Sequence, residues 1–147
     1  MLVMLILKLN KVSKLLVLQG IPGSGKTTFA RKLVEEDTSW VRVNRDDLRN
    51  MRGIYIIPAQ EHLIDEWETY CIKQALIDGY NVVADSTNLN PKTVARMQKI
   101  ADETNSEIEF RMIDIELDEA IRRDSLRPNP VGEQVVRFFY NRYVARV

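Results

Sequence analysis

The chain has 147 residues, no formal net charge at pH 7 and 45% hydrophobic residues. Its length fits one domain with a buried core, and its balanced charge excludes a global basic field that would hold a long nucleic acid. One cysteine, Cys71, excludes an internal disulfide, and one histidine, His62, leaves too few side chains for a metal site built on His and Cys.

Residues 1–7 form an apolar run, and the lysines nearby follow the run instead of preceding it. Seven residues are too few to span a bilayer, and this order is the reverse of a secretory signal. We therefore expect no membrane association. Residues 1–13 are expected to be an N-terminal extension, either an extra strand or contact surface or an appendage, ahead of a domain at 14–147.

A complete phosphate-binding loop occupies residues 20–27, which read Gly-Ile-Pro-Gly-Ser-Gly-Lys-Thr. An apolar run at 14–19 precedes it and a helical pattern from about 25 to 36 follows it, which is the context the motif requires. Glycines bring backbone N–H groups to phosphate oxygens, the lysine reaches the β- and γ-phosphates, and the hydroxyl residue binds Mg²⁺. We expect ATP to be bound by Gly20, Pro22, Gly23, Ser24, Gly25, Lys26, Thr27 and Thr28.

The rest of the chain alternates strand-like and helix-like segments. Strands are expected at 40–43, 81–85 and 108–113, and a long amphipathic helix at 60–78. Three further helices are expected to begin at Asn90–Pro91, at Asp118 as a cap and at about Gly132. This alternation predicts an α/β fold, a parallel sheet of about four strands with helices on both faces.

Polar clusters follow three of these strands: the phosphate loop, residues 44–49 and residues 85–88. Because ligands bind at the carboxyl ends of parallel strands, we expect the clusters to form one site. Asp85 follows apolar residues, which is typical of a Walker B acid that holds a water on Mg²⁺ or orients Thr27. A turn or helix-cap aspartate is the alternative.

Residues 44–49 read Asn-Arg-Asp-Asp-Leu-Arg, a pattern equally typical of a helix cap with flanking charges. Beside a γ-phosphate the same residues have a use in a kinase. A carboxylate accepts the proton of the attacking hydroxyl, and a cation holds an anionic acceptor. Asp46 and Arg49 supply this pair.

Arginines gather before a proline-broken loop at Arg122, Arg123 and Arg127. Such a lid would stabilise the charge that spreads over a transferring phosphoryl group and would exclude water. The alternative is a solvated basic helix end, which the helix dipole favours.

Four motifs in this order resemble the 5′-polynucleotide kinase family, close to the kinase domain of its bacteriophage end-healing member. They are Gly-Ile-Pro-Gly-Ser-Gly-Lys-Thr, Asn-Arg-Asp-Asp-Leu-Arg, Asp-Ser-Thr-Asn-Leu-Asn-Pro and Arg123-x-x-x-Arg127-x-x-x-Val131-Gly132, within residues 14–145. The resemblance implies a P-loop kinase that transfers the γ-phosphate of ATP, with Mg²⁺, to 5′-hydroxyl ends of DNA or RNA. It also implies a role in nucleic-acid repair in the cytoplasm, that of the host if the chain is phage-encoded.

The same resemblance implies residue roles. Asp46 would be the general base, and Arg49 would grip the acceptor's phosphate. Lys26 and Arg127 would stabilise the transferring group, and Arg123 would contact the nucleotide or brace the lid. Metal binding would fall to Thr27 and Asp85, and acceptor contacts to Asp85, Thr87 and Asn88. One extra residue before Asn88 leaves open whether Ser86 or Thr87 makes the contact.

Two other functions stay open. A small-molecule kinase would share the architecture, although Arg49 favours an anionic acceptor. A nucleotide-dependent switch without useful catalysis would not need Asp46. The segment 114–118 lacks the hydroxyl residue of an aspartyl-phosphate loop, so we expect no phosphatase activity. The sequence does not distinguish RNA from DNA, single strands from overhangs, or oligomeric states.

Overall fold

The computed structural model describes residues 1–3, 11–53 and 56–145. Its core elements alternate along the chain as the sequence predicts. In chain order they are β1 (Lys14–Gln19), α2 (Lys26–Glu36), β2 (Trp40–Asn44), α3 (Arg45–Asn50), η1 (Pro58–Gln60), α4 (Glu61–Ile77), β3 (Asn81–Asp85), α5 (Pro91–Thr104), β4 (Glu107–Met112), α6 (Leu117–Ser125), α7 (Glu133–Phe139) and the π-helical turn η2 (Tyr140–Val144).

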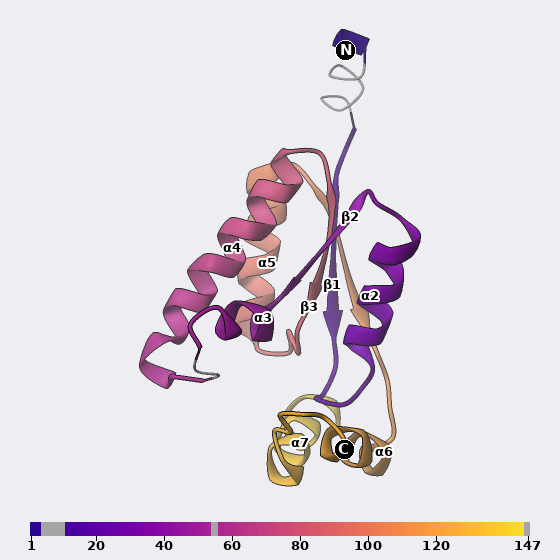
Figure 1. Ribbon diagram of the computed structural model, residues 1–147, viewed down its shortest axis with the longest axis vertical. Helices are drawn as coiled ribbons and strands as arrows, with labels where there is room; N and C mark the ends of the chain where they lie inside the picture. Colours follow the sequence, from indigo (N-terminus) through magenta and orange to yellow (C-terminus); the bar gives the residue numbers. More distant parts are fainter. Residues whose placement is uncertain (4–10, 54–55, 146–147) are drawn as a thin grey trace.

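The four strands form one sheet in the order β2-β3-β1-β4, and every neighbouring pair is parallel. Leu16 in β1 pairs with Val83 in β3 on one side and with Glu109 in β4 on the other. All four strands therefore end at one edge, the lower edge in Figure 1. The predicted α/β fold with a four-stranded parallel sheet is confirmed.

Helices cover both faces of the sheet because its strands alternate apolar side chains between the faces. Leu15 and Val17 pack with α4 and α5 on one face, and Leu16 and Leu18 pack with α2 on the other (Figure 1). The predicted core position of Cys71 agrees, since this half-buried thiol packs against the first of these clusters. His62 is exposed.

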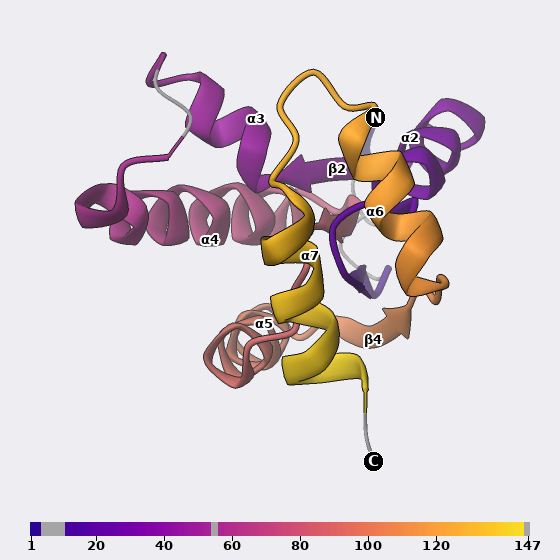
Figure 2. The ribbon, with the colours of Figure 1, turned by 90° about the horizontal axis from the view of Figure 1, so that it is seen from below.

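A third apolar cluster holds α6 and α7 across the carboxyl edge of the sheet, seen from below in Figure 2. Ile21 of the phosphate loop and Leu89 after β3 pack there against Ala120 of α6 and Val136 of α7. The arginine-bearing segment is thus placed directly over the ends of the strands.

The strand predicted at 108–113 begins and ends one residue earlier, and the start of α6 differs more. Glu116 is the N-cap residue of α6, and Asp118 lies in the first turn. Leu117 packs in the third cluster, so the helix begins early enough to include it. Asp118 instead contributes its charge to the positive end of the helix dipole.

The expected N-terminal extension lies largely outside the described residues, which do not include 4–10. Within the described ranges, no helix is long and apolar enough to cross a membrane.

Candidate active site

The phosphate loop joins β1 to α2 at the carboxyl edge, and its glycines meet close neighbours. Gly23 has φ +82°, and a Cβ built there would lie 2.4 Å from the carbonyl oxygen of Ala120 in α6. Gly25 caps α2 with φ +101°, a conformation that L-residues with side chains rarely adopt. Only glycine therefore lets the loop turn into α2 while α6 packs against it.

Lys26 is buried at the start of α2, and its ammonium group folds back over the loop. It donates to the carbonyl oxygens of Gly20 and Ile21, both at 2.9 Å, and to Ser24 Oγ at 3.1 Å. Burial lowers the pKa of Lys26 to about 8, while the negative charge of Asp85 opposes that shift. The charges of Arg127 and Asp46 also reach this ammonium group, so the three polar clusters do converge on the loop.

Asp46 stands in the first turn of α3, which begins directly after β2. The Asn44 side chain caps this helix by accepting a hydrogen bond from the Asp47 backbone N–H at 3.0 Å. Arg49, one turn later, donates from Nη1 to Asp46 Oδ1 at 2.8 Å. The cap interpretation of this segment and its place in the site are therefore compatible, because the cap orients Asp46.

Glu61 at the start of α4 fixes the other side of the Arg49 guanidinium. Arg49 Nε donates to Glu61 Oε2 at 3.2 Å, and Nη2 donates to Oε1. The hydrogen bonds from Arg49 hold the pKa of the Glu61 carboxyl below its ordinary value. Arg49 is thus presented as a rigid, planar donor between two carboxylates.

The loop after α6 brings a second arginine to Asp46. Arg127 Nη2 lies 3.5 Å from Asp46 Oδ2, so the two carboxylate oxygens face different guanidinium groups. Because α6 ends at Ser125, Arg127 does not lie on the helix face that carries Arg123, although its backbone N–H still donates to the Asp124 carbonyl at 3.0 Å.

Asp124 gives that loop its shape. Its buried carboxylate accepts from the backbone N–H groups of Val131 at 3.1 Å and Gly132 at 2.9 Å, and Arg127 Nη1 lies 3.5 Å away. The chain between α6 and α7 is therefore closed around one carboxylate, which sets the direction of Arg127.

The other arginines of this segment are engaged on α6 itself. Arg122 and Arg123 both pair with Glu119, at 2.6 Å and 2.9 Å. Arg123 nevertheless reaches the phosphate loop, because its Nη1 lies 3.5 Å from the position of a Cβ on Gly25. Arg123 thus lies beside the phosphate loop, whereas Arg122 is an exposed surface side chain.

Asp85 ends β3 with its carboxylate buried and partnered. Oδ2 accepts from Arg42 Nε at 2.8 Å and from Asn44 Nδ2 at 3.3 Å, and the Asp85 carbonyl accepts from the same Asn44 amide at 2.7 Å. Arg42 also donates from Nη1 to Asp47 at 2.7 Å. The acid of the site is therefore linked to α3 through one arginine of β2.

Residues 86–88 connect this acid to the phosphate loop through the main chain. The Thr87 carbonyl accepts from the Gly20 N–H at 3.1 Å, and the Ser86 hydroxyl donates to the Asp85 carbonyl at 2.7 Å. Asn88, at φ +48°, donates from Nδ2 to the carbonyls of Leu18, Ala84 and Ser86. An acceptor contact by Thr87 or Asn88 stays a prediction, and Asn88 holds the ends of β1 and β3 together.

The donors near the loop fit the demands of Mg²⁺ in a nucleotide site. Such a site takes one or two protein oxygens and completes its octahedron with phosphates and water. The Thr27 hydroxyl, next to Lys26, and the Asp85 carboxylate, whose charge reaches Lys26, are oxygen donors of this kind. In the part of the chain that is described, no group of three His, Cys, Asp or Glu side chains could hold a metal alone.

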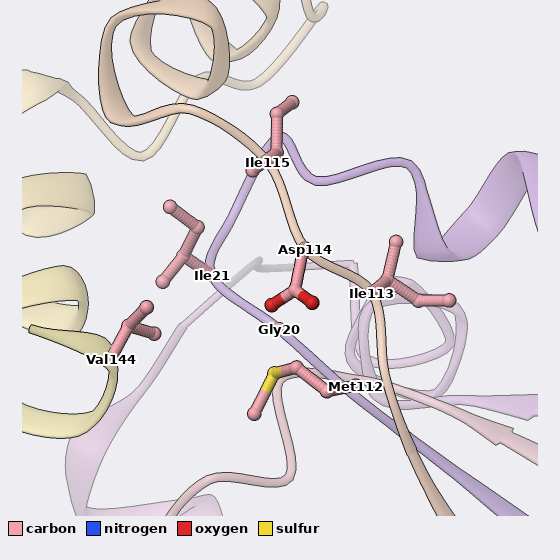
Figure 3. A pocket seen from close by; sticks show the side chains of 7 residues that line it. All are labelled: Gly20, Ile21, Met112, Ile113, Asp114, Ile115 and Val144. Carbon is pink, nitrogen blue, oxygen red and sulfur yellow. The ribbon is translucent and has the colours of Figure 1, made fainter.

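A small cavity lies on the β4 side of the loop, and the Asp114 carboxylate points into it (Figure 3). Its volume of about 10 Å³ matches one water molecule and is far too small for a nucleotide base. It is lined by Gly20, Ile21, Met112, Ile113, Asp114, Ile115 and Val144.

A buried carboxylate behind the site joins three helices. Glu68 of α4 is fully buried and accepts from Arg45 of α3 at 3.1 Å and from Arg96 of α5 at 2.6 Å. Since Arg45 directly precedes Asp46, this cluster fixes the position of α3 relative to α4 and α5.

Several side chains that shape the site are not predicted in the sequence analysis, and three of them carry a signal. Glu68 stands midway between Ile64 and Ile72 on the buried stripe of α4, where an acid is unexpected. Asp124 lies in the last turn of a helix, where the dipole disfavours a negative charge. Arg42 interrupts the apolar residues Trp40, Val41 and Val43 of β2.

Comparison with known proteins gives one family and several relatives. A family profile described as an AAA domain matches residues 15–143. The "Putative bifunctional polynucleotide kinase/RNA ligase" of Autographa californica nuclear polyhedrosis virus is 30% identical over 155 residues, covering 94% of this chain and 22% of the viral protein. The L-seryl-tRNA(Sec) kinase of Methanococcus maripaludis is 23% identical over 133 residues, covering 88% of this chain and 52% of that enzyme.

Among solved structures, a chain of the Pnkp1/Rnl/Hen1 RNA repair complex superimposes with a TM-score of 0.77 at 31% identity. The match covers 87% of this chain and 43% of that one. This chain therefore spans from about a fifth to about half of the length of these relatives.

Proposed function

The chain belongs to this AAA-domain family, and from that premise we propose that it is a P-loop kinase that transfers the γ-phosphate of ATP to the 5′-hydroxyl end of DNA or RNA. The observation that carries the proposal is the position of Asp46, which lies between Arg49 and Arg127 and within electrostatic reach of Lys26. A nucleotide switch needs no such carboxylate.

The chemistry follows from these groups. The acceptor's 5′-oxygen forms a bond to the γ-phosphorus while the bond from that phosphorus to the β–γ bridging oxygen breaks, and ADP leaves. Asp46 accepts the proton of the attacking hydroxyl. Lys26 and Arg127 stabilise the charge that spreads over the moving group, and Arg123 assists at the nucleotide.

Mg²⁺ would be held by Thr27 and, directly or through water, by Asp85. When bound, it neutralises charge on the β- and γ-phosphates. The loop residues Gly20, Pro22, Gly23, Ser24, Gly25 and Thr28 complete the ATP site through their backbone and the α2 N-terminus.

Arg49 is the residue that we assign to the acceptor. Its guanidinium already forms a two-bond contact with the Glu61 carboxylate, the geometry that also suits a phosphate. We assign it the phosphate next to the acceptor's terminal nucleoside, with Thr87 and Asn88 nearby. The viral relative and the RNA repair complex support a nucleic-acid acceptor.

A role in nucleic-acid repair and a place in the cytoplasm belong to the same proposal. A bacteriophage origin stays a prediction, since the viral relative named above comes from a baculovirus.

The test is transfer of labelled γ-phosphate from ATP with Mg²⁺ to four acceptors: a 5′-hydroxyl DNA, a 5′-hydroxyl RNA, a 3′-nucleoside monophosphate and a nucleoside. The proposal predicts label on the first three and little on the nucleoside. Equal labelling of the nucleoside would favour a small-molecule kinase, and no labelling of any acceptor despite ATP binding would favour a switch.

A further inference from the structure

Arg42 is the strongest unexplained feature of the site. It comes from an edge strand, yet its guanidinium bonds to Asp85 at 2.8 Å and to Asp47 at 2.7 Å, and only 14% of the side chain is exposed. Asp85 is the acid that the proposed function places at the metal, so a fixed positive charge already sits beside a candidate metal ligand.

One oxygen of the Asp85 carboxylate is already hydrogen-bonded within the protein. Oδ2 accepts from both Arg42 and Asn44, and Oδ1 accepts no hydrogen bond from the described part of the chain. An oxygen with two donors has little capacity left for a cation. The carboxylate is therefore oriented for use through one oxygen, directly or through water.

The second contact of Arg42 points to α3. Asp47 is the neighbour of Asp46, and its backbone N–H is bonded to the cap residue Asn44. Arg42 and Asn44 thus both touch Asp85 and both hold the first turn of α3. Arg42 and Asn44 therefore fix the position of Asp85, the candidate metal ligand, relative to Asp46, the candidate base.

We propose that Arg42 is a positioning residue that weakens metal binding at Asp85 and, in return, fixes Asp85 and Asp46 in their working arrangement. The inference rests on the metal role that the proposed function gives Asp85, but not on the identity of the acceptor. It makes an unusual prediction, since removing Arg42 should tighten metal binding and slow turnover.

The test measures metal binding without any acceptor. Calorimetry gives the Kd of ADP in EDTA and in excess Mn²⁺, and the ratio of the two is the metal enhancement. Arg42→Gln removes the positive charge beside Asp85, so the enhancement should rise by roughly 10-fold. In the kinase assay the same variant should turn over roughly 10-fold more slowly at saturating ATP.

Two variants control this experiment. Arg111→Gln breaks the same kind of bond, from Arg Nε to a carboxylate at 2.7 Å, on the opposite edge strand, and should leave both readouts at the wild-type level. Arg42→Lys keeps the charge but loses the fork that joins two carboxylates. Arg42→Lys should therefore show the wild-type metal enhancement of ADP binding but a slower turnover in the kinase assay.

An unchanged or lower enhancement in folded Arg42→Gln would overturn the proposal, because a merely structural arginine would weaken both functions together. If Arg42→Gln does not fold, the test rests on the turnover of Arg42→Lys. A wild-type turnover in Arg42→Lys would overturn the proposal. If the protein transfers label to none of the acceptors, the proposed function is refuted. The Mn²⁺ enhancement of ADP binding would still test whether Arg42 weakens metal binding at Asp85.

Discussion

Arg127 and Asp46, which are far apart in the sequence, meet at the carboxyl edge of the sheet with Nη2 and Oδ2 separated by 3.5 Å. One comes from the loop after α6 and the other from the first turn of α3. The contact places the arginine-bearing loop over the acidic cluster, beside the phosphate loop.

Replacing Arg127 with alanine separates a catalytic arginine from a solvated helix end. The side chain is 36% exposed, and the buried Asp124 keeps two backbone donors without it, so its ion pairs should contribute little to stability. An arginine that stabilises the transferring group can contribute about 10³-fold in rate. Turnover should therefore fall by about that factor while the melting temperature barely changes.

Lysine should restore only part of this activity, because it lacks the planar fork. Arg137→Ala on α7 is the matched control, since it removes another exposed arginine whose partner, Glu133, lies on the same helix. If Arg127→Ala turns over as fast as Arg137→Ala, Arg127 has no catalytic role.

Asp46→Asn keeps the shape of the side chain but removes its ability to accept a proton. We expect turnover to fall by roughly 10²-fold or more, with little change in the Michaelis constant for ATP. Steady-state kinetics with Asp102→Asn, an exposed aspartate of α5, provide the comparison. A change confined to the ATP Michaelis constant would mean that Asp46 is not the base.

Lys26 makes stability depend on pH in a defined direction. Its pKa is lowered from 10.5 to about 8 by burial, so between these values the unfolded chain binds more protons than the folded one. Stability must then rise with pH across this window. Relative to Lys26→Met, the wild type should gain on the order of 2–3 kcal/mol from pH 8 to 10.5.

Denaturant unfolding of both proteins at several pH values measures that difference. A constant difference between pH 7 and 10.5 would show that the Lys26 ammonium is not destabilised in the fold. Lys26→Met should also abolish phosphoryl transfer, because the charge at the β- and γ-phosphates is lost.

Glu68 should contribute more to stability than any surface acid. Glu68→Ala would remove the buried partner of Arg45 and Arg96, which keep the exposed Asp65, so we expect a loss of about 3 kcal/mol, the lower end for a broken buried pair. Glu66→Ala, an exposed position on the same helix, should cost less than about 0.5 kcal/mol. Equal unfolding midpoints for the two variants would contradict the proposed role of Glu68 as the anchor of α3.

The sequence predicts the strands and the phosphate loop well because their signals are local. Residues 14–19 and 81–85 are apolar runs bounded by polar residues, and both form strands over those residues. Asn90 and Pro91 also begin α5 as predicted, because cap chemistry involves only neighbouring residues.

The supporting contacts were not predicted because their partners are distant along the chain. Arg42 reaches Asp85 across 43 residues, and Arg96 reaches Glu68 across 28. No local pattern specifies such pairs, although an isolated charge on an apolar stripe indicates that a partner exists. The start of α6 shows the opposite case. Asp118 is a favourable cap residue, but the packing of Leu117 makes the helix begin before it.

The most direct test of the central claim is whether the enzyme recognises a phosphate on its acceptor. Arg49→Ala removes the side chain that is proposed to bind this phosphate. Transfer to a 3′-nucleoside monophosphate and to the matching nucleoside is measured for the wild type and the variant. A lost charge-assisted contact of about 1.5–3 kcal/mol should lower kcat/KM by roughly 10- to 150-fold on the phosphorylated acceptor and much less on the nucleoside. Equal losses on both acceptors would contradict a kinase that recognises nucleic-acid ends.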